Sequence, residues 1–262
     1  MTSAPASSRD TIDLPGLAGS LLERLRTERI RVHAITNAAA QTFTANLLLA
    51  AGGIPSLTVA PEEVTSFTHR ASALLVNLGT LDRDRREAIP QAIATARDHA
   101  KPWVLDPVFV EASPPRLEFA RSCLAGVPCV LRCNAGEFAA LAGEDATPGP
   151  VQTFANSHAT VVALTGAVDL ITDGTRLIRI ENGHPLMGYV TAMGCAGTAL
   201  VAAFTALHDN ALEAAVAALL VTGIAGEIAA RDANGPGTFQ TAFLNALFNL
   251  NPATLVAHGK IS

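Results

Sequence analysis

The chain has 262 residues, of which 49% are hydrophobic and only 16% are charged, and its formal net charge is −5. This length suffices for one large domain or two small ones, and the apolar content suffices for a sizeable core. No cluster of Lys and Arg offers the positive surface that a phosphate backbone needs, so we expect no nucleic-acid partner. The low charged fraction also favours a chain that buries part of its surface in an oligomer.

The sequence predicts a cytoplasmic protein without a membrane partner. Residues 1–10 are rich in Ser, Ala and Pro and lack the apolar run of a signal peptide, and polar residues interrupt the apolar stretch 211–230. The spacing of the four cysteines matches no zinc site, which favours reduced thiols. They are Cys123, Cys129, Cys133 and Cys195. We expect residues 1–15 to form a disordered tail and residues 16–262 to form a single domain.

Short apolar runs alternate with longer helical patterns over much of the chain. The runs are nearly continuous in apolar residues, as buried parallel strands usually are. The predicted strands are Arg31–Ile35, Ile54–Val59, Leu74–Asn77, Trp103–Leu105, Cys129–Arg132 and Thr160–Leu164. The predicted helices between them are Gln41–Ala51, Arg83–His99, Pro115–Leu124 and Glu137–Leu141. The next two segments are predicted to form a hairpin. They are Leu170–Asp173 and Arg176–Glu181.

Only helical patterns follow after the hairpin. Cys195–Leu207 and Ala211–Arg231 are apolar on most faces, as core helices are, and Asn245–His258 is predicted to be a terminal helix. Pro148-Gly149-Pro150 is predicted to be a loop, and no stretch resembles an interdomain linker. The expected fold class is α/β, a three-layer α/β/α domain with a mainly parallel central sheet.

Polar residues gather where the predicted strands end. In a parallel α/β sheet, ligands bind beyond the carboxyl ends of the strands, so these residues are expected to share one rim. They are Thr36, Asn37, Asn77, Gly79, Asp106, Asn134, Glu137, Thr165 and Gly166. Asp106, Asn134 and Glu137 carry the oxygen ligands that Mg²⁺ prefers, and Arg132 carries a planar donor group suited to phosphate. Each also has an ordinary explanation, such as a turn at Asp106 or a helix cap at Asn134 that Glu137 completes.

The segment Val190–Leu200 (V-T-A-M-G-C-A-G-T-A-L) predicts a glycine-containing turn that opens into a helix. Backbone N–H groups at a helix start have no intrahelical partners and carry partial positive charge, which suits a phosphate. The expected anion loop is Ala192, Met193, Gly194 and Cys195. A thiol in such a first turn is expected to have its thiolate favoured, although a buried Cys acting as a small hydrophobe is the competing interpretation. Together with the strand-end residues, the loop favours a magnesium–nucleotide site.

Several motifs are absent from the sequence. It contains no G-x-x-x-x-G-K-[ST] motif of P-loop enzymes, and no G-x-G-x-x-G dinucleotide motif follows the first predicted strand. It also lacks the G-x-S-x-G motif of α/β-hydrolases. His33 and His184 have no metal-like spacing and are interpreted as structural or pocket-lining residues.

Eight motifs occur in unbroken order between about residue 20 and about residue 250. They are Val32–Asn46 (V-H-A-I-T-N-A-A-A-Q-T-F-T-A-N), Pro61–Val64 (P-E-E-V), Asn77–Leu81 (N-L-G-T-L), Asp106–Val108 (D-P-V), Arg132–Glu137 (R-C-N-A-G-E), Leu164–Asp169 (L-T-G-A-V-D), Asn182–His184 (N-G-H) and Gly235–Gln240 (G-P-G-T-F-Q). Together they resemble the hydroxyethylthiazole kinase family. The resemblance implies a ribokinase-like fold, a homotrimer with active sites at subunit interfaces, and a role in thiamine salvage. The implied reaction phosphorylates the hydroxyl of 5-(2-hydroxyethyl)-4-methylthiazole with ATP and Mg²⁺.

The resemblance also implies a role for each site residue. Cys195 would be the catalytic residue beside the substrate hydroxyl, acting as a proton acceptor and positioner and not as a covalent nucleophile, because phosphoryl transfer needs little base catalysis. The ATP-binding residues would be Arg132, Thr165 and Asn134. The substrate-binding residues would be Asn37, Leu57 and Ala192. The residues associated with Mg²⁺ would be Asp106 and Glu137.

Two segments depart from the family pattern. Ala192 stands where the family usually has a glycine, and a positive φ there would cost the alanine about 1 kcal/mol. Phe109-Val110-Glu111-Ala112 replaces the family's G-A-G-A, which would narrow the pocket or bring Glu111 near the metal.

Two alternatives to the thiazole kinase remain open. One is another ribokinase-like alcohol kinase, acting on a hydroxymethylpyrimidine or a sugar, against which the motifs at His33–Asn37 and Gly235–Gln240 argue. The other is a ligand-binding homologue with impaired catalysis, against which the retention of Asp106, Arg132 and Cys195 argues.

Overall fold

The computed structural model describes residues 12–262. Most of the expected tail, residues 1–11, lies outside the described residues. Leu14 and Pro15, which the sequence analysis assigned to that tail, form the first turn of helix α1 (Leu14–Glu28), and Asp13 caps this helix by accepting a hydrogen bond from Gly16 N.

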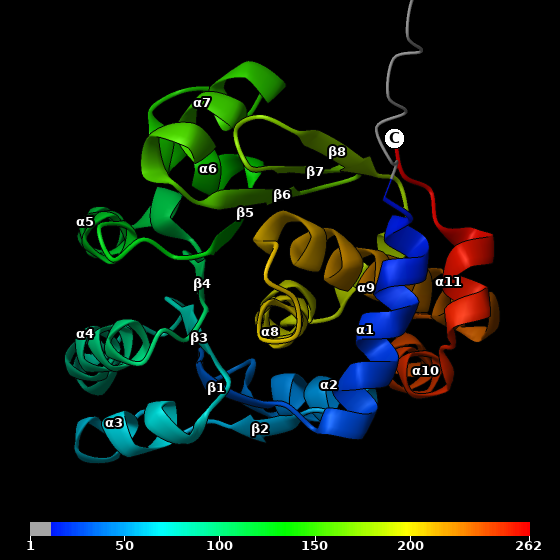
Figure 1. Ribbon diagram of the computed structural model, residues 1–262, viewed down its shortest axis with the longest axis horizontal. Coiled ribbons are helices and arrows are strands. Elements are labelled where there is room, and N and C mark those ends of the chain that lie inside the picture. Colours follow the sequence, from blue (N-terminus) through cyan, green and yellow to red (C-terminus); the bar gives the residue numbers. More distant parts are fainter. Residues whose placement is uncertain (1–11) are drawn as a thin grey trace, which may run out of the picture.

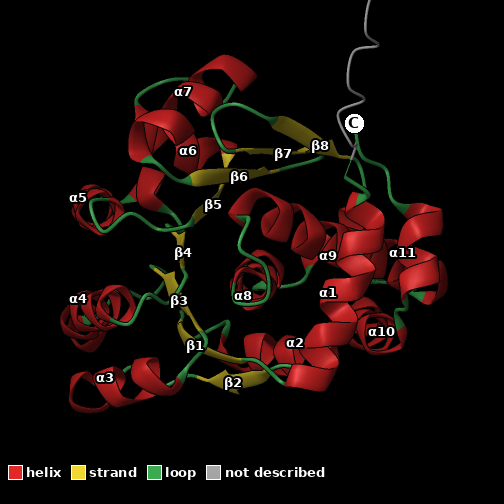
Figure 2. Cartoon of the chain, in the orientation of Figure 1, coloured by secondary structure: helices red, strands yellow, loops and turns green. Residues whose placement is uncertain are grey.

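One eight-stranded sheet runs through the protein in the order β2-β1-β3-β4-β5-β6-β7-β8 (Figures 1 and 2). Neighbouring strands are parallel from β2 to β6, whereas β7 and β8 form an antiparallel hairpin at one edge. The strands are β1 (Arg31–Ile35), β2 (Ile54–Ser56), β3 (Ala73–Asn77), β4 (Trp103–Asp106), β5 (Val130–Asn134), β6 (Val161–Thr165), β7 (Asp169–Thr172) and β8 (Leu177–Ile180). The expected mainly parallel sheet is therefore confirmed.

Helices cover both faces of the sheet and form two separate apolar cores (Figure 1). On one face lie α3 (Pro61–Arg70), α4 (Arg83–Asp98), α5 (Pro114–Leu124), α6 (Ala135–Ala142) and α7 (Pro148–His158). On the other face lie α8 (Met193–Thr205) and α9 (Ala211–Asp232), surrounded by α1, α2 (Gln41–Ala51), α10 (Pro236–Asn249) and α11 (Pro252–His258). This arrangement confirms the three-layer α/β/α fold class.

The helices α8 and α9 form the centre of the second core. Most of their residues are buried, and most are Ala, Val, Leu or Gly, which lets them pack closely against the sheet and each other. By length and composition α9 could cross a membrane, but 83% of its most apolar window is buried inside the protein, as in a core helix. The start of α8 lies against β1, β3 and β4, and this contact brings the expected anion loop to the sheet.

Some local predictions were wrong for identifiable reasons. Pro148 begins α7 instead of a loop, because proline at the first turn of a helix loses no hydrogen bond. The predicted terminal helix is two helices, α10 and α11, since Asn251 caps a new start through Thr254 N. Helices α1 and α3 were not among the predicted elements, and β2 is shorter than expected, ending at Ser56.

Candidate active site

Asp106 is the buried carboxylate at the carboxyl end of β4. Its Oδ2 accepts hydrogen bonds from Asn77 Nδ2 at 2.8 Å and from Thr198 Oγ1 at 3.1 Å. Its Oδ1 has no partner among the described residues. Burial raises the pKa of Asp106 to about 6; the charge of Arg132 opposes this rise, and that of Glu137 adds to it. A buried oxygen without a partner at this place points to a group that the protein itself does not supply.

Two asparagines connect Asp106 to the first turn of α8. Asn37 Nδ2, just after β1, donates to Asn77 Oδ1 at 3.1 Å and to Cys195 Sγ at 3.3 Å. Asn77 ends β3, which lies between β1 and β4 in the sheet. A Cβ at Gly79 would lie 2.6 Å from Asn37 Cβ, so only glycine permits this close approach. The ends of three neighbouring strands and the start of α8 therefore meet in one hydrogen-bonded cluster.

The expected anion loop lies at the amino terminus of α8. The helix begins at Met193, two residues before the predicted start, and Ala192 precedes it with φ 68°. An alanine in this left-handed region is strained by about 1 kcal/mol, the cost expected where the missing glycine would have had a positive φ. A Cβ at Gly194 would lie 2.8 Å from both terminal nitrogens of Arg132, so the guanidinium lies directly against the loop. A phosphate here would meet backbone N–H groups and a cation together.

The structure corrects the expectation that the thiolate of Cys195 is favoured. Burial raises the pKa of the Cys195 thiol to about 12, and the nearby charge of Asp106 contributes to the rise, while hydrogen bonds from Asn77 and Asn37 and the charge of Arg132 oppose it. The sequence showed the helix start but not the burial or the neighbouring carboxylate. At neutral pH the thiol is protonated, so it can orient a ligand but cannot take a proton in the resting protein.

A cavity of about 570 Å³ opens beside the anion loop. Its lining includes Arg132 from β5, Thr165 at the end of β6 and Gly194 from α8. Residues of the short 3₁₀ helix η2 (Pro185–Tyr189) and of α9 also line it. Asp169, to which the sequence analysis gave no role, also lines the cavity and holds the turn after β6 by accepting from Gly166 N at 2.9 Å. Burial raises the pKa of Asp169 to about 6.

Glu137 and Asn134 form the capping box that the sequence analysis weighed against a metal site. Asn134 Oδ1 accepts from Glu137 N and Glu137 Oε2 accepts from Asn134 N, both at 2.9 Å. Glu137 Oε1 accepts from the backbone N–H of Phe109 at 3.0 Å. Both carboxylate oxygens are thus already engaged, which leaves Asp106 as the better candidate for direct metal binding. Within residues 12–262 no group of three or more His, Cys, Asp or Glu side chains could hold a metal.

The remaining predicted residues lie on or near the same rim. Leu57 follows the edge strand β2 and is half-buried against the core. Phe109 is in the left-handed region with φ 57°, and its side chain is largely exposed. Glu111 lies in the 3₁₀ helix η1 (Val110–Ala112), where its Cγ would be 4.0 Å from a Cβ at Gly136. Thr198, which the sequence analysis did not select, lies one turn after Cys195 on α8 and contacts Asp106.

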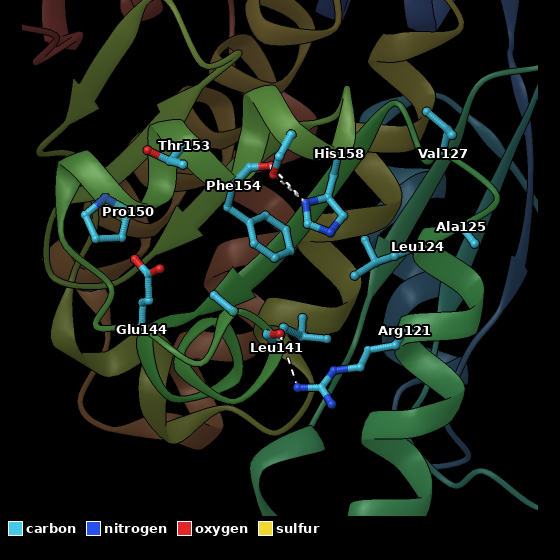
Figure 3. A pocket seen from close by; sticks show the side chains of 12 residues that line it. Arg121, Leu124, Ala125, Val127, Leu141, Glu144, Pro150, Thr153, Phe154 and His158 are labelled. Atoms are coloured by element: carbon cyan, nitrogen blue, oxygen red, sulfur yellow. Dashed lines mark hydrogen bonds between the residues drawn. The ribbon is translucent and has the colours of Figure 1, made fainter.

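Figure 3 shows a second hollow, which lies toward the opposite ends of the strands from the rim. This groove, of about 640 Å³, is lined by α5, α6 and α7 near the amino ends of β5 and β6. None of the predicted site residues lines it. Its principal lining residues are Arg121, Leu124, Val127, Leu141, Glu144, Phe154 and His158.

Comparisons with known proteins point to one family. The model of the family described as "Hydroxyethylthiazole kinase family" matches residues 22–253. A hydroxyethylthiazole kinase of Granulibacter bethesdensis is 46% identical over 248 residues, which cover 90% of each chain. The solved structure of a hydroxyethylthiazole kinase protein from Pyrococcus horikoshii has a TM-score of 0.90 and 36% identity, covering 94% of this chain and 98% of that one. A ribokinase-like superfamily protein of Enterococcus faecalis is 14% identical with a TM-score of 0.65, covers 92% of this chain and 90% of that one, and shares the fold.

Proposed function

The chain belongs to the hydroxyethylthiazole kinase family, as its eight motifs predicted, and we propose that it transfers the γ-phosphoryl group of ATP to the hydroxyl of 5-(2-hydroxyethyl)-4-methylthiazole. The observation that carries the proposal is that three groups lie together at one rim of the sheet. The guanidinium of Arg132 lies against Gly194, and the Cys195 thiol accepts a hydrogen bond from Asn37. Asp106 has a buried oxygen with no hydrogen-bond partner among the described residues. This combination supplies a phosphate cradle, a candidate metal ligand and an acceptor site side by side.

The nucleotide would occupy the cavity between the turn after β6, η2 and α9. Arg132 and the amino terminus of α8 would hold the phosphate groups, since both offer N–H donors to one place. Thr165 lines the same cavity. Asn134 stands at the exposed end of β5, where its Oδ1 caps α6, so its Nδ2 is the group left for ATP.

The donor set at Asp106 fits a divalent cation in part. Its Oδ1 is buried and has no partner within residues 12–262, while Asn77 and Thr198 fix the other oxygen. Asp106 would therefore bind Mg²⁺ directly, and Glu137 would act through its charge or through a bridging water, because both its oxygens already accept from backbone N–H groups. Bound Mg²⁺ would neutralise charge on the transferring phosphoryl group.

The acceptor alcohol would lie beside Cys195, between the start of α8 and the end of β1. Asn37, the strained Ala192 and half-buried Leu57 surround this place in the family pattern. The protonated thiol orients the hydroxyl and takes no proton from it in the resting state. A bond forms between the hydroxyl oxygen and phosphorus as the bond to the ADP oxygen breaks. The alcohol proton leaves late, as expected when bond making to the nucleophile lags behind, and passes to a non-bridging oxygen of the transferred phosphoryl group.

We also propose a homotrimer with active sites at subunit interfaces, located in the cytoplasm. The low charged fraction supports an assembly, as do exposed apolar side chains on three of the helices that cover one face of the sheet. They are Leu49 of α2, Phe248 of α10 and Val256 of α11. Light scattering coupled to gel filtration should give three times the chain mass of 27.1 kDa; a monomer at micromolar concentration would contradict the shared site.

A coupled assay of ADP release tests the reaction. With Mg-ATP and the thiazole alcohol we expect ADP release that depends on both, and removal of Mg²⁺ by chelation should stop it. Turnover with a hydroxymethylpyrimidine or a sugar, but not with the thiazole alcohol, would replace the proposal with another alcohol kinase. Binding of the alcohol without turnover would indicate a ligand-binding homologue.

A further inference from the structure

We infer that Asn77 fixes the direction of a chain of hydrogen bonds at the acceptor site. In this direction both amide hydrogens of Asn37 are used within the protein, so Asn37 can only accept a hydrogen bond from a ligand. The site therefore recognises a hydrogen-bond donor, the alcohol hydroxyl. The chain runs from Asp106 through Asn77 and Asn37 to Cys195. The inference rests on the proposed function, because it states how the same site recognises the alcohol. It assigns Asn77 a positioning role, since Asn77 acts on the ligand through Asn37.

The orientation of the Asn77 amide is set by its neighbours. One end of the amide lies 3.1 Å from the backbone nitrogen of Gly79, and a backbone N–H can only donate, so this end is Oδ1. The other end lies 2.8 Å from Asp106 Oδ2, and an ionised carboxylate can only accept, so this end is Nδ2. A flipped amide would face a donor with a donor and an acceptor with an acceptor. Asn77 is fully buried, so no water competes for either end.

The orientation of Asn77 then sets that of Asn37. Because Asn77 presents its oxygen, Asn37 must donate to it through Nδ2, at 3.1 Å. The second hydrogen of that Nδ2 goes to Cys195 Sγ at 3.3 Å. An amide nitrogen carries two hydrogens, and both are now used. Within the part of the chain that the structure describes, no donor reaches Asn37 Oδ1, so this oxygen is the group that Asn37 has left for a ligand.

This polarity has a chemical consequence. A hydroxyl that lies beside Cys195 can donate its hydrogen to Asn37 Oδ1, which keeps a lone pair of the hydroxyl oxygen free to approach phosphorus. A thiazole ring nitrogen only accepts, so it cannot pair with Asn37. A purely structural role for Asn77 would tie β3 to β4 but would leave the preference for a donor unchanged, and this difference makes the two roles separable.

The wild-type protein provides the first test. Calorimetric binding is measured for the alcohol and for two analogues, in which fluorine or hydrogen replaces the hydroxyl. Fluorine is close in size to a hydroxyl and can accept weakly but cannot donate. We expect the fluoroethyl analogue to bind no more tightly than the ethyl analogue, and the alcohol to bind at least about tenfold more tightly than either. A fluoroethyl analogue that binds as tightly as the alcohol would overturn the inference.

Two variants provide the second test. Asn77→Leu keeps the side-chain size but removes both ends of the amide. The side-chain amide of Asn37 is then free to flip. It should weaken alcohol binding about tenfold and reduce the preference over the fluoroethyl analogue. Asn245→Leu, at an exposed position of α10, is the matched control and should change neither. An unchanged preference in folded Asn77→Leu would contradict the inference; if this variant fails to fold, the wild-type ligand series still decides.

The exchange variant Asn77→Asp/Asp106→Asn gives a further discriminating result. The carboxylate introduced at position 77 still accepts from Gly79 N and Asn37, so the direction at Asn37 is kept. We expect the preference for the alcohol to return while kcat stays low, because the carboxylate has left position 106. A folded exchange variant without that preference would contradict the inference. Wild-type protein that neither binds nor phosphorylates the alcohol would instead refute the proposed function.

Discussion

The protein has two cavities toward opposite ends of its strands, and they differ in what their polar groups do. In the groove between α5, α6 and α7, Arg121 donates hydrogen bonds to the carbonyl oxygens of Ala140 and Leu141 near the end of α6 (Figure 3). The His158 ring stacks on the Phe154 ring, with 3.9 Å between the ring centroids. These polar groups complete the fold. At the rim formed by the carboxyl ends of the strands, Asp106 has a buried oxygen without a partner in the described part of the chain, and the Arg132 guanidinium lies against the start of α8.

The comparison shows which features identify chemistry. The groove is somewhat larger than the cavity at the carboxyl edge, about 640 Å³ against about 570 Å³, so size does not separate them. Backbone strain does not separate them either, since Val127 and Ala159 beside the groove have positive φ, as do Phe109 and Ala192 at the rim. What separates them is a cluster of buried polar groups that bond to one another and still leave Asp106 Oδ1 without a partner among the described residues.

Among the changes that test this difference between the two cavities, Asp106→Asn is expected to have the largest effect, which is a loss of kcat. Loss of the carboxylate should lower kcat about 10³-fold, because charge stabilisation dominates phosphoryl transfer. The folded-state pKa of Asp106 is raised to about 6, so its contribution to stability is present below its unfolded pKa and lost as pH rises through 6. At pH 8 the variant should therefore be no less stable than wild type in urea unfolding. Equal loss of activity and stability would make Asp106 a structural residue.

The substitution Phe154→Ala tests the groove as a part of the fold. Phe154 is almost fully buried and packs edge-on against Phe138, so its truncation should destabilise the protein by about 3 kcal/mol. Activity at a temperature where the variant stays folded should be unchanged. Urea unfolding and steady-state kinetics measure the two effects, and a change in KM for either substrate would connect the groove to the site.

His33 is a buried polar group that has an unpartnered atom but lies away from the rim. Its Nδ1 lies 3.0 Å from Ser56 Oγ and its Nε2 has no partner among the described residues. Burial lowers the pKa of His33 to about 4, so the folded state resists protonation and stability falls as pH drops below the unfolded value of 6.5. We expect His33 by itself to lower the free energy of unfolding by about 2 kcal/mol between pH 7.5 and 5.

The variant His33→Gln isolates this contribution. Between pH 7.5 and 5 its unfolding free energy should fall by about 2 kcal/mol less than that of wild type, measured by urea unfolding at both pH values, because glutamine does not titrate while Asp106 and Asp169 contribute alike to both proteins. Its kcat at pH 7.5 should match that of wild type. A large fall in kcat would mean that His33 on β1 takes part in catalysis, as Asp106 is proposed to do, and is not only a buried structural residue.

The substitution Cys195→Ser should lower kcat about tenfold and leave ATP binding unchanged. The serine hydroxyl can still accept from Asn37, but its shorter bond moves the group that orients the alcohol. Steady-state kinetics and ATP titration separate the two effects. An unchanged kcat would remove Cys195 from the mechanism.

The smallest expected effect is a gain in stability from Ala192→Gly. Glycine relieves the strain at φ 68°, although part of the gain is offset by the greater freedom of the unfolded chain, so we expect about 0.5 kcal/mol. Ala159→Gly, at φ 48° beside the groove, is the matched control and should give a similar gain. Thermal unfolding and kinetics should show that only Ala192→Gly changes kcat, because only Ala192 precedes the anion loop.

The sequence predicted the fold class, the strands and the polar residues of the rim, but not helices α1 and α3. Continuous apolar runs predicted the parallel strands, and the polar residues at their ends meet as expected because parallel strands end at the same edge. The sequence could not predict the burial of Cys195 or the charge beside it, so the state of the thiol was predicted wrongly. The contacts of Asn77 and Thr198 with Asp106 join residues far apart in sequence, and no local pattern indicates them.

The most direct measurement of the central claim is the ³¹P NMR spectrum of the products after wild-type protein is incubated with ATP, Mg²⁺ and the thiazole alcohol. We predict equal amounts of ADP and of a phosphate monoester whose phosphorus couples to the CH₂ of the former hydroxyethyl group. ADP with inorganic phosphate alone, or no consumption of ATP, would contradict the claim that the carboxyl edge of the sheet transfers phosphate to this alcohol.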